Sequence, residues 1–217
     1  MGEITTVIFD VGMVLADFAW KQYLEELYPD DRKVICELGE GIFLSDLWEE
    51  RDVGLRKEED YIADFHKRLP QYEREIDRIF SEIHRAVREY PYSAGWLKNV
   101  KMQGYRVLIL SNFAKNGFEY LESHYSFIPY VDGIVVSYRE QLAKPDKRIY
   151  ERLLQRYGLT GSECIFIDDR AKNLIPAAEL GIHTILFESR EQTASVLKDT
   201  YGIIAEEEAA FQSMGKG

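Results

Sequence analysis

Three short apolar stretches of this 217-residue sequence each end in polar side chains. The first ends at Asp10, the second at Ser111 and Asn112, and the third at Asp168 and Asp169. The carboxyl ends of adjacent parallel strands meet at one edge of a sheet, where ligands bind. If the apolar stretches are such strands, these five side chains lie together and form a candidate site.

Lys144 adds a positive charge to the expected cluster, because its AKPD sequence follows another apolar stretch. Pro145 biases the backbone of Lys144 toward an extended conformation. Three carboxylates brought close together away from water cannot all stay ionised without a cation, and one lysine is not enough. Mg²⁺ prefers oxygen ligands. We therefore expect Mg²⁺ as the cofactor of this site.

An aspartate beside Mg²⁺ can attack the phosphorus of a phosphomonoester and form an aspartyl-phosphate. Asp10 is the residue expected to do so. Ser111, Asn112 and Lys144 would bind the equatorial phosphoryl oxygens, where charge develops in the transition state. Water would then hydrolyse the acyl-phosphate.

The elements that must position these residues alternate between strands and helices. Continuous apolar runs are typical of strands buried on both faces of a parallel sheet, and helical spacing of apolar residues predicts helices over 91–103, 146–158 and 171–181. Such alternation implies right-handed crossovers and an α/β fold with a doubly wound, Rossmann-like parallel sheet. The expected strands are 5–9, 106–110, 133–137, 164–167 and 183–187.

A long segment between the first two expected strands interrupts the alternation of strands and helices. Residues 17–90 show helical periodicity throughout, with Tyr72, Ile76, Ile79, Phe80, Ile83 and Val87 on one stripe. We expect an α/β core of 1–16 and 91–217, with 17–90 inserted as a helical cap. Trp20 and Trp48 are expected to pack within this cap, and either could instead face a substrate. The tail from about 203 is expected to be frayed.

Four segments in order, FDVGMVL, LILSN, AKPD and FIDDRAKN, resemble the four motifs of the haloacid dehalogenase superfamily. Within it the chain most resembles the alpha-D-glucose-1-phosphate phosphatase branch and the phosphatase domain of soluble epoxide hydrolases. The resemblance implies a phosphatase whose substrate is a small phosphorylated metabolite, a sugar phosphate being favoured.

The resemblance also implies a role for each matching position. Asp10 matches the nucleophile and a Mg²⁺ ligand, and the backbone carbonyl of Gly12 matches a second ligand. Asp169 matches a further metal ligand, while Asp168 matches a catalytic partner of the metal-bound water or of Lys144. Ser111, Asn112 and Lys144 match the phosphate-binding residues, and Asn173 matches a polar residue that holds the acidic loop.

Gly12 departs from the pattern, because most phosphatases of the superfamily have an aspartate there as general acid and base. Three interpretations stay open. The enzyme works without that aspartate, as enzymes with a good leaving group can; or the protein binds phosphate and turns it over poorly; or it is a 2-haloacid dehalogenase, which the adjacent Asp168 and Asp169 disfavour. A receiver domain is disfavoured because it would place the acidic pair first.

The net charge of −11 argues against nucleic acid or an anionic membrane surface as the main partner. Cys36 and Cys164 are expected to be reduced core thiols, and no transmembrane or signal segment is recognisable. These features predict a cytoplasmic protein, and they leave its oligomeric state unknown.

Overall fold

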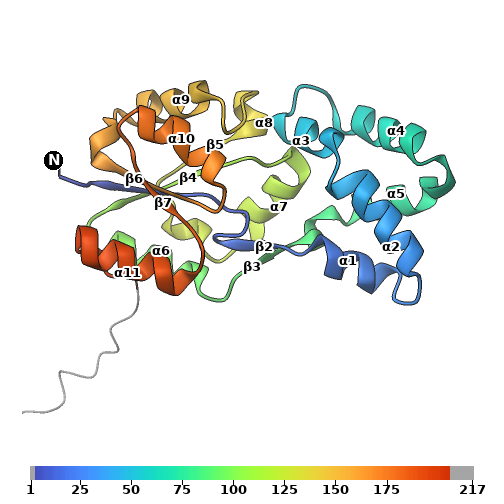
Figure 1. The fold of residues 1–217 in the computed structure, drawn as a ribbon, viewed down its shortest axis with the longest axis horizontal. Coiled ribbons are helices and arrows are strands. Elements are labelled where there is room, and N and C mark those ends of the chain that lie inside the picture. The colour runs from blue at the N-terminus through green and yellow to red at the C-terminus, as the bar shows by residue number, and fades with distance from the viewer. Residues whose placement is uncertain (1–2, 206–217) are drawn as a thin grey trace, which may run out of the picture.

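The computed structural model describes residues 3–205, which contain a central sheet of five parallel strands (Figure 1). The order across the sheet is β5-β4-β1-β6-β7, so the first strand lies in the middle. This confirms the predicted doubly wound α/β fold. The strands are β1 (Thr6–Phe9), β4 (Arg106–Ser111), β5 (Gly133–Val136), β6 (Cys164–Asp168) and β7 (His183–Leu186).

Both faces of the sheet are covered, which explains why the strands are continuously apolar. Val7 and Phe9 of β1 belong to one hydrophobic cluster, whereas Ile8 between them belongs to another on the opposite face. The first cluster includes residues of α6 (Ser93–Met102), α7 (Lys115–His124) and α11 (Arg190–Tyr201). The second includes residues of α9 (Lys147–Tyr157) and α10 (Ala171–Glu179).

The predicted helices α6, α9 and α10 are confirmed, within a few residues at each end. Helix α9 shows why: the side chain of Asp146 accepts a hydrogen bond from the Arg148 N–H at its start. At its end Gly158 takes a left-handed conformation with φ of 62°, which costs glycine little. Helix α11 was not foreseen from the sequence.

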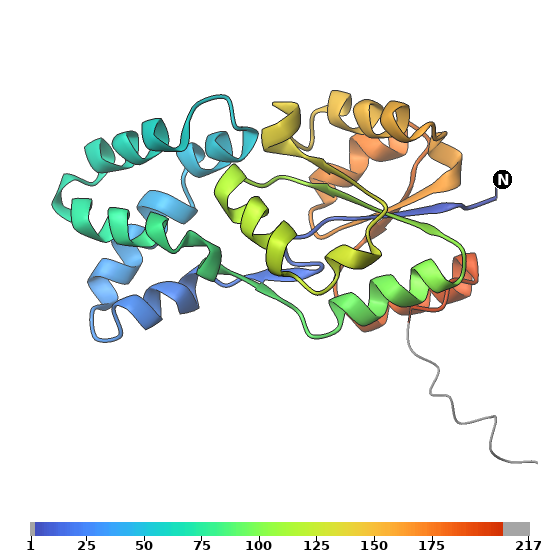
Figure 2. The ribbon, with the colours of Figure 1, turned by 180° about the vertical axis from the view of Figure 1, so that it is seen from behind.

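A second body of helices lies beside the sheet, at its carboxyl-terminal edge (Figures 1 and 2). It has its own hydrophobic core, in which Tyr23, Phe65 and Ile79 are fully buried. We call it the cap. Its α-helices are α1 (Trp20–Leu27), α2 (Arg32–Leu38), α3 (Asp46–Val53), α4 (Glu58–Arg68) and α5 (Glu73–Ser81), with short 3₁₀ or π turns at Gly39–Phe43, Pro70–Tyr72 and Ile83–Ala86.

The sequence predicted that residues 17–90 are helical throughout, and this prediction was wrong. Two short antiparallel strands, β2 (Ala16–Phe18) and β3 (Val87–Glu89), join the cap to the sheet domain. Val87 therefore lies in a strand and does not continue the stripe of α5. Strands of three residues are too short to show the alternation that predicts a strand.

Two smaller expectations were also wrong. Ile203 and Ala205 are buried in the core, so this part of the tail is not frayed, and the rest of the predicted tail (206–217) lies outside the described residues. Cys36 is exposed, although Cys164 is buried as expected and both thiols are unpaired. None of the helices within 3–205 is long and apolar enough to cross a membrane.

Candidate active site

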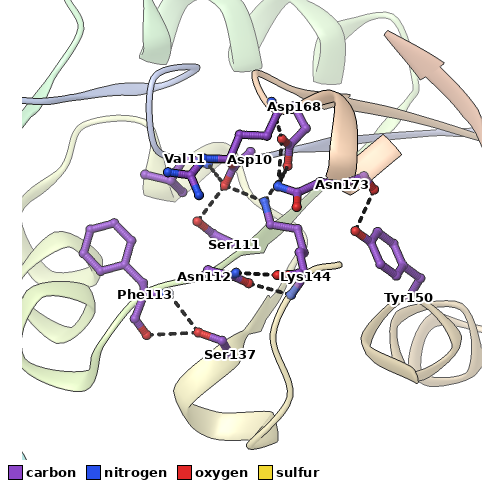
Figure 3. A network of polar contacts seen from close by, with 11 residues as sticks. Asp10, Val11, Ser111, Asn112, Phe113, Ser137, Lys144, Tyr150, Asp168 and Asn173 are labelled. Carbon is purple, nitrogen blue, oxygen red and sulfur yellow. Dashed lines mark hydrogen bonds and ion pairs between the residues drawn. The ribbon is translucent and has the colours of Figure 1, made fainter. Parts of the chain in front are cut away.

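Asp10 lies at the carboxyl end of β1, and three donors converge on its Oδ1 atom (Figure 3). The backbone N–H of Val11 and the hydroxyl of Ser111 each donate to it at 2.7 Å. The Nζ atom of Lys144 lies 2.9 Å from the same oxygen. Asp10 itself is 7% exposed, so its carboxylate is held in one orientation with little contact with water.

Asp168, at the end of β6, is fully buried and also bound to Lys144. Its Oδ2 atom accepts a hydrogen bond of 2.6 Å from Lys144, and its Oδ1 atom accepts one of 2.8 Å from the Arg170 N–H. The side-chain amide of Asn173 donates to both oxygens at 3.0 Å. With both oxygens occupied, Asp168 fixes the ammonium of Lys144 beside Asp10.

Asn112 lies next to Ser111 and lines the cavity, and its side chain bonds the backbone of Lys144. Its Nδ2 atom donates to the Lys144 carbonyl at 2.9 Å, and its Oδ1 atom accepts from the Lys144 N–H at 2.8 Å. The amide of Asn112 therefore positions Lys144 (Figure 3). The phosphate-binding role expected for Asn112 stays a prediction, and the structure adds this contact with the Lys144 backbone.

The charges in this cluster shift one another's ionisation. Burial, together with the nearby charge of Asp168, raises the pKa of Asp10 to about 6, although Lys144 and Ser111 act against this. Burial alone would lower the pKa of Lys144, but Asp10 and Asp168 outweigh it and raise that pKa. Burial and Asp168 also raise the pKa of Asp169. The site thus holds more negative charge than one ammonium neutralises.

A metal ion fits this excess charge. Asp10, Asp168 and Asp169 each offer a carboxylate oxygen, and the three oxygens lie within 4.8 Å of one another. Oxygen donors at such spacing suit Mg²⁺, a hard cation. Both oxygens of Asp168 accept hydrogen bonds, whereas the three donors to Asp10 all bind its Oδ1 atom. Asp10 and the half-buried Asp169 are therefore the carboxylates best placed to hold the ion.

Gly12 lines the same cavity, two residues after Asp10. No other atom lies within 4 Å of the position that a Cβ on Gly12 would occupy. Steric crowding therefore does not explain why this residue is glycine. A side chain there would point into open space near Asp10.

The cavity has a volume of about 830 Å³ and is lined by both the sheet domain and the cap. All the predicted site residues except Asp168 line it. Trp48 of α3 lines it too, whereas Trp20 stacks on Phe43 at 5.5 Å between ring centroids and is absent from the lining.

Asp52 and Met13 also line this cavity, and sequence reasoning missed both. The Ala114 N–H, in the loop after β4, donates to the Asp52 carboxyl. Burial raises the pKa of Asp52 to about 7 against the lowering effect of Arg51. No motif marks Asp52, because only the docking of α3 on the sheet domain brings it to the cavity.

Comparison with known proteins places this geometry in a family. Residues 4–181 match the family model for haloacid dehalogenase-like hydrolases. The chain belongs to the haloacid dehalogenase-like hydrolases. It is therefore an enzyme of hydrolase type, and the predicted superfamily is confirmed.

Individual haloacid dehalogenase-like proteins are similar over different lengths. A sesquiterpene phosphatase of Aspergillus oryzae is 30% identical over 176 residues, 81% of this chain and 85% of the relative. A (S)-2-haloacid dehalogenase of Burkholderia cepacia is 28% identical over 109 residues, 50% of this chain and 47% of the relative.

Among solved structures, an enzyme of the family from Bacteroides thetaiotaomicron, in complex with magnesium and inorganic phosphate, superposes with a TM-score of 0.64. It is 20% identical, and the match covers 88% of this chain and 98% of that one. At this identity the likeness concerns the fold.

Proposed function

We propose that this hydrolase is a Mg²⁺-dependent phosphatase that removes phosphate from a small phosphomonoester through an aspartyl-phosphate on Asp10. The observation that carries the proposal is the environment of the Asp10 carboxylate. One oxygen is held by Ser111, Lys144 and the Val11 N–H, and two further carboxylates lie beside it. An immobilised carboxylate next to a cation site is what attack on phosphorus requires.

The residues divide the reaction between them. A carboxylate oxygen of Asp10 forms a bond to phosphorus while the bond from phosphorus to the leaving oxygen breaks. The leaving oxygen takes its proton from water, because Gly12 carries no acid. The Lys144 ammonium and the Ser111 hydroxyl stabilise the charge on the phosphoryl oxygens. Water then attacks the aspartyl-phosphate, which releases inorganic phosphate and restores Asp10.

Mg²⁺ bound by Asp10, Asp169 and the Gly12 carbonyl would supply positive charge that offsets the repulsion between Asp10 and the phosphate dianion. Lys144, fixed by Asp168 and Asn112, keeps its ammonium charged beside the same group. Asp168 therefore acts through Lys144, and its complete burial suits that positioning role.

Two sources suggest the organic part of the substrate. The resemblance to alpha-D-glucose-1-phosphate phosphatase favours a sugar phosphate, whose anomeric oxygen leaves readily without the proton that an aspartate at Gly12 would donate. The sesquiterpene phosphatase relative favours an apolar alcohol.

The alternatives from the sequence have less support in the site. A dehalogenase needs no cation and gains nothing from the adjacent acids Asp168 and Asp169. A phosphate-binding protein without turnover would not need the Asp10 carboxylate, because placing it beside a bound phosphate adds repulsion.

The test is phosphate release from 4-nitrophenyl phosphate, with Mg²⁺ and with excess chelator. We expect activity that depends on Mg²⁺ and that Asp10→Asn lowers by roughly 10³-fold or more, as removal of a nucleophile does. Asp46→Asn, a change of the same kind at a cavity residue paired with Arg68, is the control and should keep most of the activity. Full turnover by Asp10→Asn would refute the mechanism, and undiminished turnover in chelator would refute the metal.

A further inference from the structure

We propose that the alcohol released by this enzyme is an uncharged aliphatic one, held by apolar side chains that line the cavity, among them Met13 of the sheet domain and Leu44 of the cap. The inference rests on the proposed function, and it replaces the polar sugar that the sequence resemblance favours. Met13 comes from the loop after β1 and Leu44 from the cap, and both line the cavity that contains Asp10.

Met13 is presented to the cavity by a strained backbone. Its φ is 60°, a left-handed conformation that non-glycine residues rarely adopt. The loop enforces it, since the Met13 N–H donates to the Ala16 carbonyl at 2.7 Å and the Ala16 N–H donates to the Val11 carbonyl at 2.9 Å. A large apolar side chain at this position is nevertheless 43% exposed, three residues after the nucleophile. Strain and exposure together indicate a contact that is made with a ligand.

The cap and the β2 strand that leads into it supply further apolar side chains to the cavity lining. Leu44 is 65% exposed, and Trp48 and Phe18 also line the cavity. The Phe18 and Trp48 rings stack with centroids 5.6 Å apart, and Phe43 lies 4.9 Å from Trp48. These rings are held together by one another, so they present a fixed apolar surface that an aliphatic chain can cover.

The charges around the cavity disfavour a second anionic group on the substrate. Among the described residues that line it, every lysine and arginine already has an acidic partner. Arg51 is bound to Glu58 at 2.5 Å, and Arg170 and Lys172 lie 3.7 and 3.9 Å from Glu49. Lys144 is bound between Asp10 and Asp168. Arg170 and Lys172 share the single carboxylate of Glu49, but six acidic side chains line the cavity against four basic ones. The negative balance of this lining counts against a second phosphate or carboxylate on the substrate.

Three substrates test the proposal: octyl phosphate below its micelle concentration, glucose 1-phosphate, and 4-nitrophenyl phosphate. Because an anomeric oxygen leaves more readily than an alkyl oxygen, the comparison uses KM and the dissociation constant of the Asp10→Asn variant, not kcat. We expect octyl phosphate to bind at least about tenfold more tightly than glucose 1-phosphate. Equal binding, or tighter binding of the sugar, would overturn the inference.

Variants then locate the contact. Leu44→Gln and Met13→Gln should each raise KM for octyl phosphate by roughly tenfold and leave KM for glucose 1-phosphate within about twofold. Leu55→Gln and Met102→Gln are matched controls, because these side chains are 60% and 74% exposed but lie outside the cavity lining. They should change neither value. Equal effects of Leu44→Gln on both substrates, or none on either, would also overturn the inference.

The outcome for the proposed function is separate. If no substrate releases phosphate in Mg²⁺, the proposed activity fails. Calorimetric titration of octyl phosphate and glucose 1-phosphate into the unmodified protein would still decide whether the cavity prefers the aliphatic chain.

Discussion

Gly12 lies two residues after Asp10, the proposed nucleophile, and no atom outside the two adjacent residues lies within 4 Å of the position of an added Cβ. We predict that Gly12→Asp fits without loss of folding and raises kcat mainly for alkyl phosphates, by roughly 10-fold to 100-fold. A general acid matters most when the leaving oxygen is a poor leaving group. The measurement is kcat for octyl phosphate and for glucose 1-phosphate.

Gly12→Asn is the control for this change, because it has the same size and cannot donate a carboxyl proton. It should give no increase in kcat. Equal increases for both substrates with Gly12→Asp would contradict the leaving-group argument.

The carboxyl group of Asp52 should make the stability of the protein depend on pH. Burial raises its pKa to about 7 in the folded protein, against a usual value of 3.8. The folded state therefore binds the proton more tightly than the unfolded state does. This contribution to stability is fully present below the unfolded pKa and is lost as the pH rises through about 7.

The variant Asp52→Asn should remove this pH dependence, because asparagine does not ionise. The full pKa shift would correspond to about 4 kcal/mol between about pH 4 and pH 8. Because Asp52 is only partly buried, we expect the unmodified protein to lose roughly 2 kcal/mol of unfolding free energy over this range, relative to the variant. Urea unfolding at both pH values measures it. Asp30→Asn, which removes an exposed carboxylate from the cap surface, is the control. Parallel pH profiles for Asp52→Asn and the unmodified protein would show that the Asp52 carboxyl ionises normally.

Among the elements, the end of α3 fixes how the cap lies against the sheet domain. Gly54 ends this helix with φ of 73°, and a Cβ there would lie 2.8 Å from the Cα of Tyr138, at the start of α8 (Ser137–Glu140). The hydroxyl of Ser137 also hydrogen-bonds the Asp52 carbonyl. The cap therefore docks by a close backbone approach that only glycine allows.

We predict that Gly54→Ala destabilises the protein by roughly 3 kcal/mol, from the left-handed backbone and the clash together. Gly158→Ala is the matched control: its φ is 62°, but no atom lies within 4 Å of the added Cβ. It should cost only about 1 kcal/mol. Chemical denaturation of both variants measures the two losses of unfolding free energy. Equal losses would mean that Tyr138 moves aside without cost and that the close contact does not matter.

For the whole molecule, folding gathers three carboxylates in a protein whose net charge is already −11. A bound cation relieves that repulsion only in the folded state. At about 100 times its dissociation constant, a ligand adds roughly 2.7 kcal/mol of stability. For a chain of this size, we expect Mg²⁺ to raise Tm by about 5–10 °C.

Thermal unfolding in Mg²⁺ and in KCl of equal ionic strength measures this shift and separates binding from general screening. Asp169→Asn should abolish most of the Mg²⁺-specific shift. A Tm that responds equally to both salts would contradict a specific metal site.

The central sheet and the residues at its edge could be predicted from local sequence patterns. Continuous apolar runs ending in Asp10, Ser111 and Asp168 predict buried parallel strands, and parallel strands bring their ends together by geometry alone. Local signals of this kind need no knowledge of distant contacts. The same holds for α9, because Asp146 at its start and Gly158 at its end mark the helix boundaries in the sequence.

The surroundings of that edge depend on contacts between distant segments and could not be predicted in this way. The β2–β3 pair forms because segments some 70 residues apart meet, and Asp52 becomes a cavity residue only when α3 docks through Gly54. The left-handed Met13 depends on hydrogen bonds across its loop, and the Asn112 amide was drawn to the Lys144 backbone. Each of these depends on which partner is near in space, and neither residue type nor spacing encodes that partner.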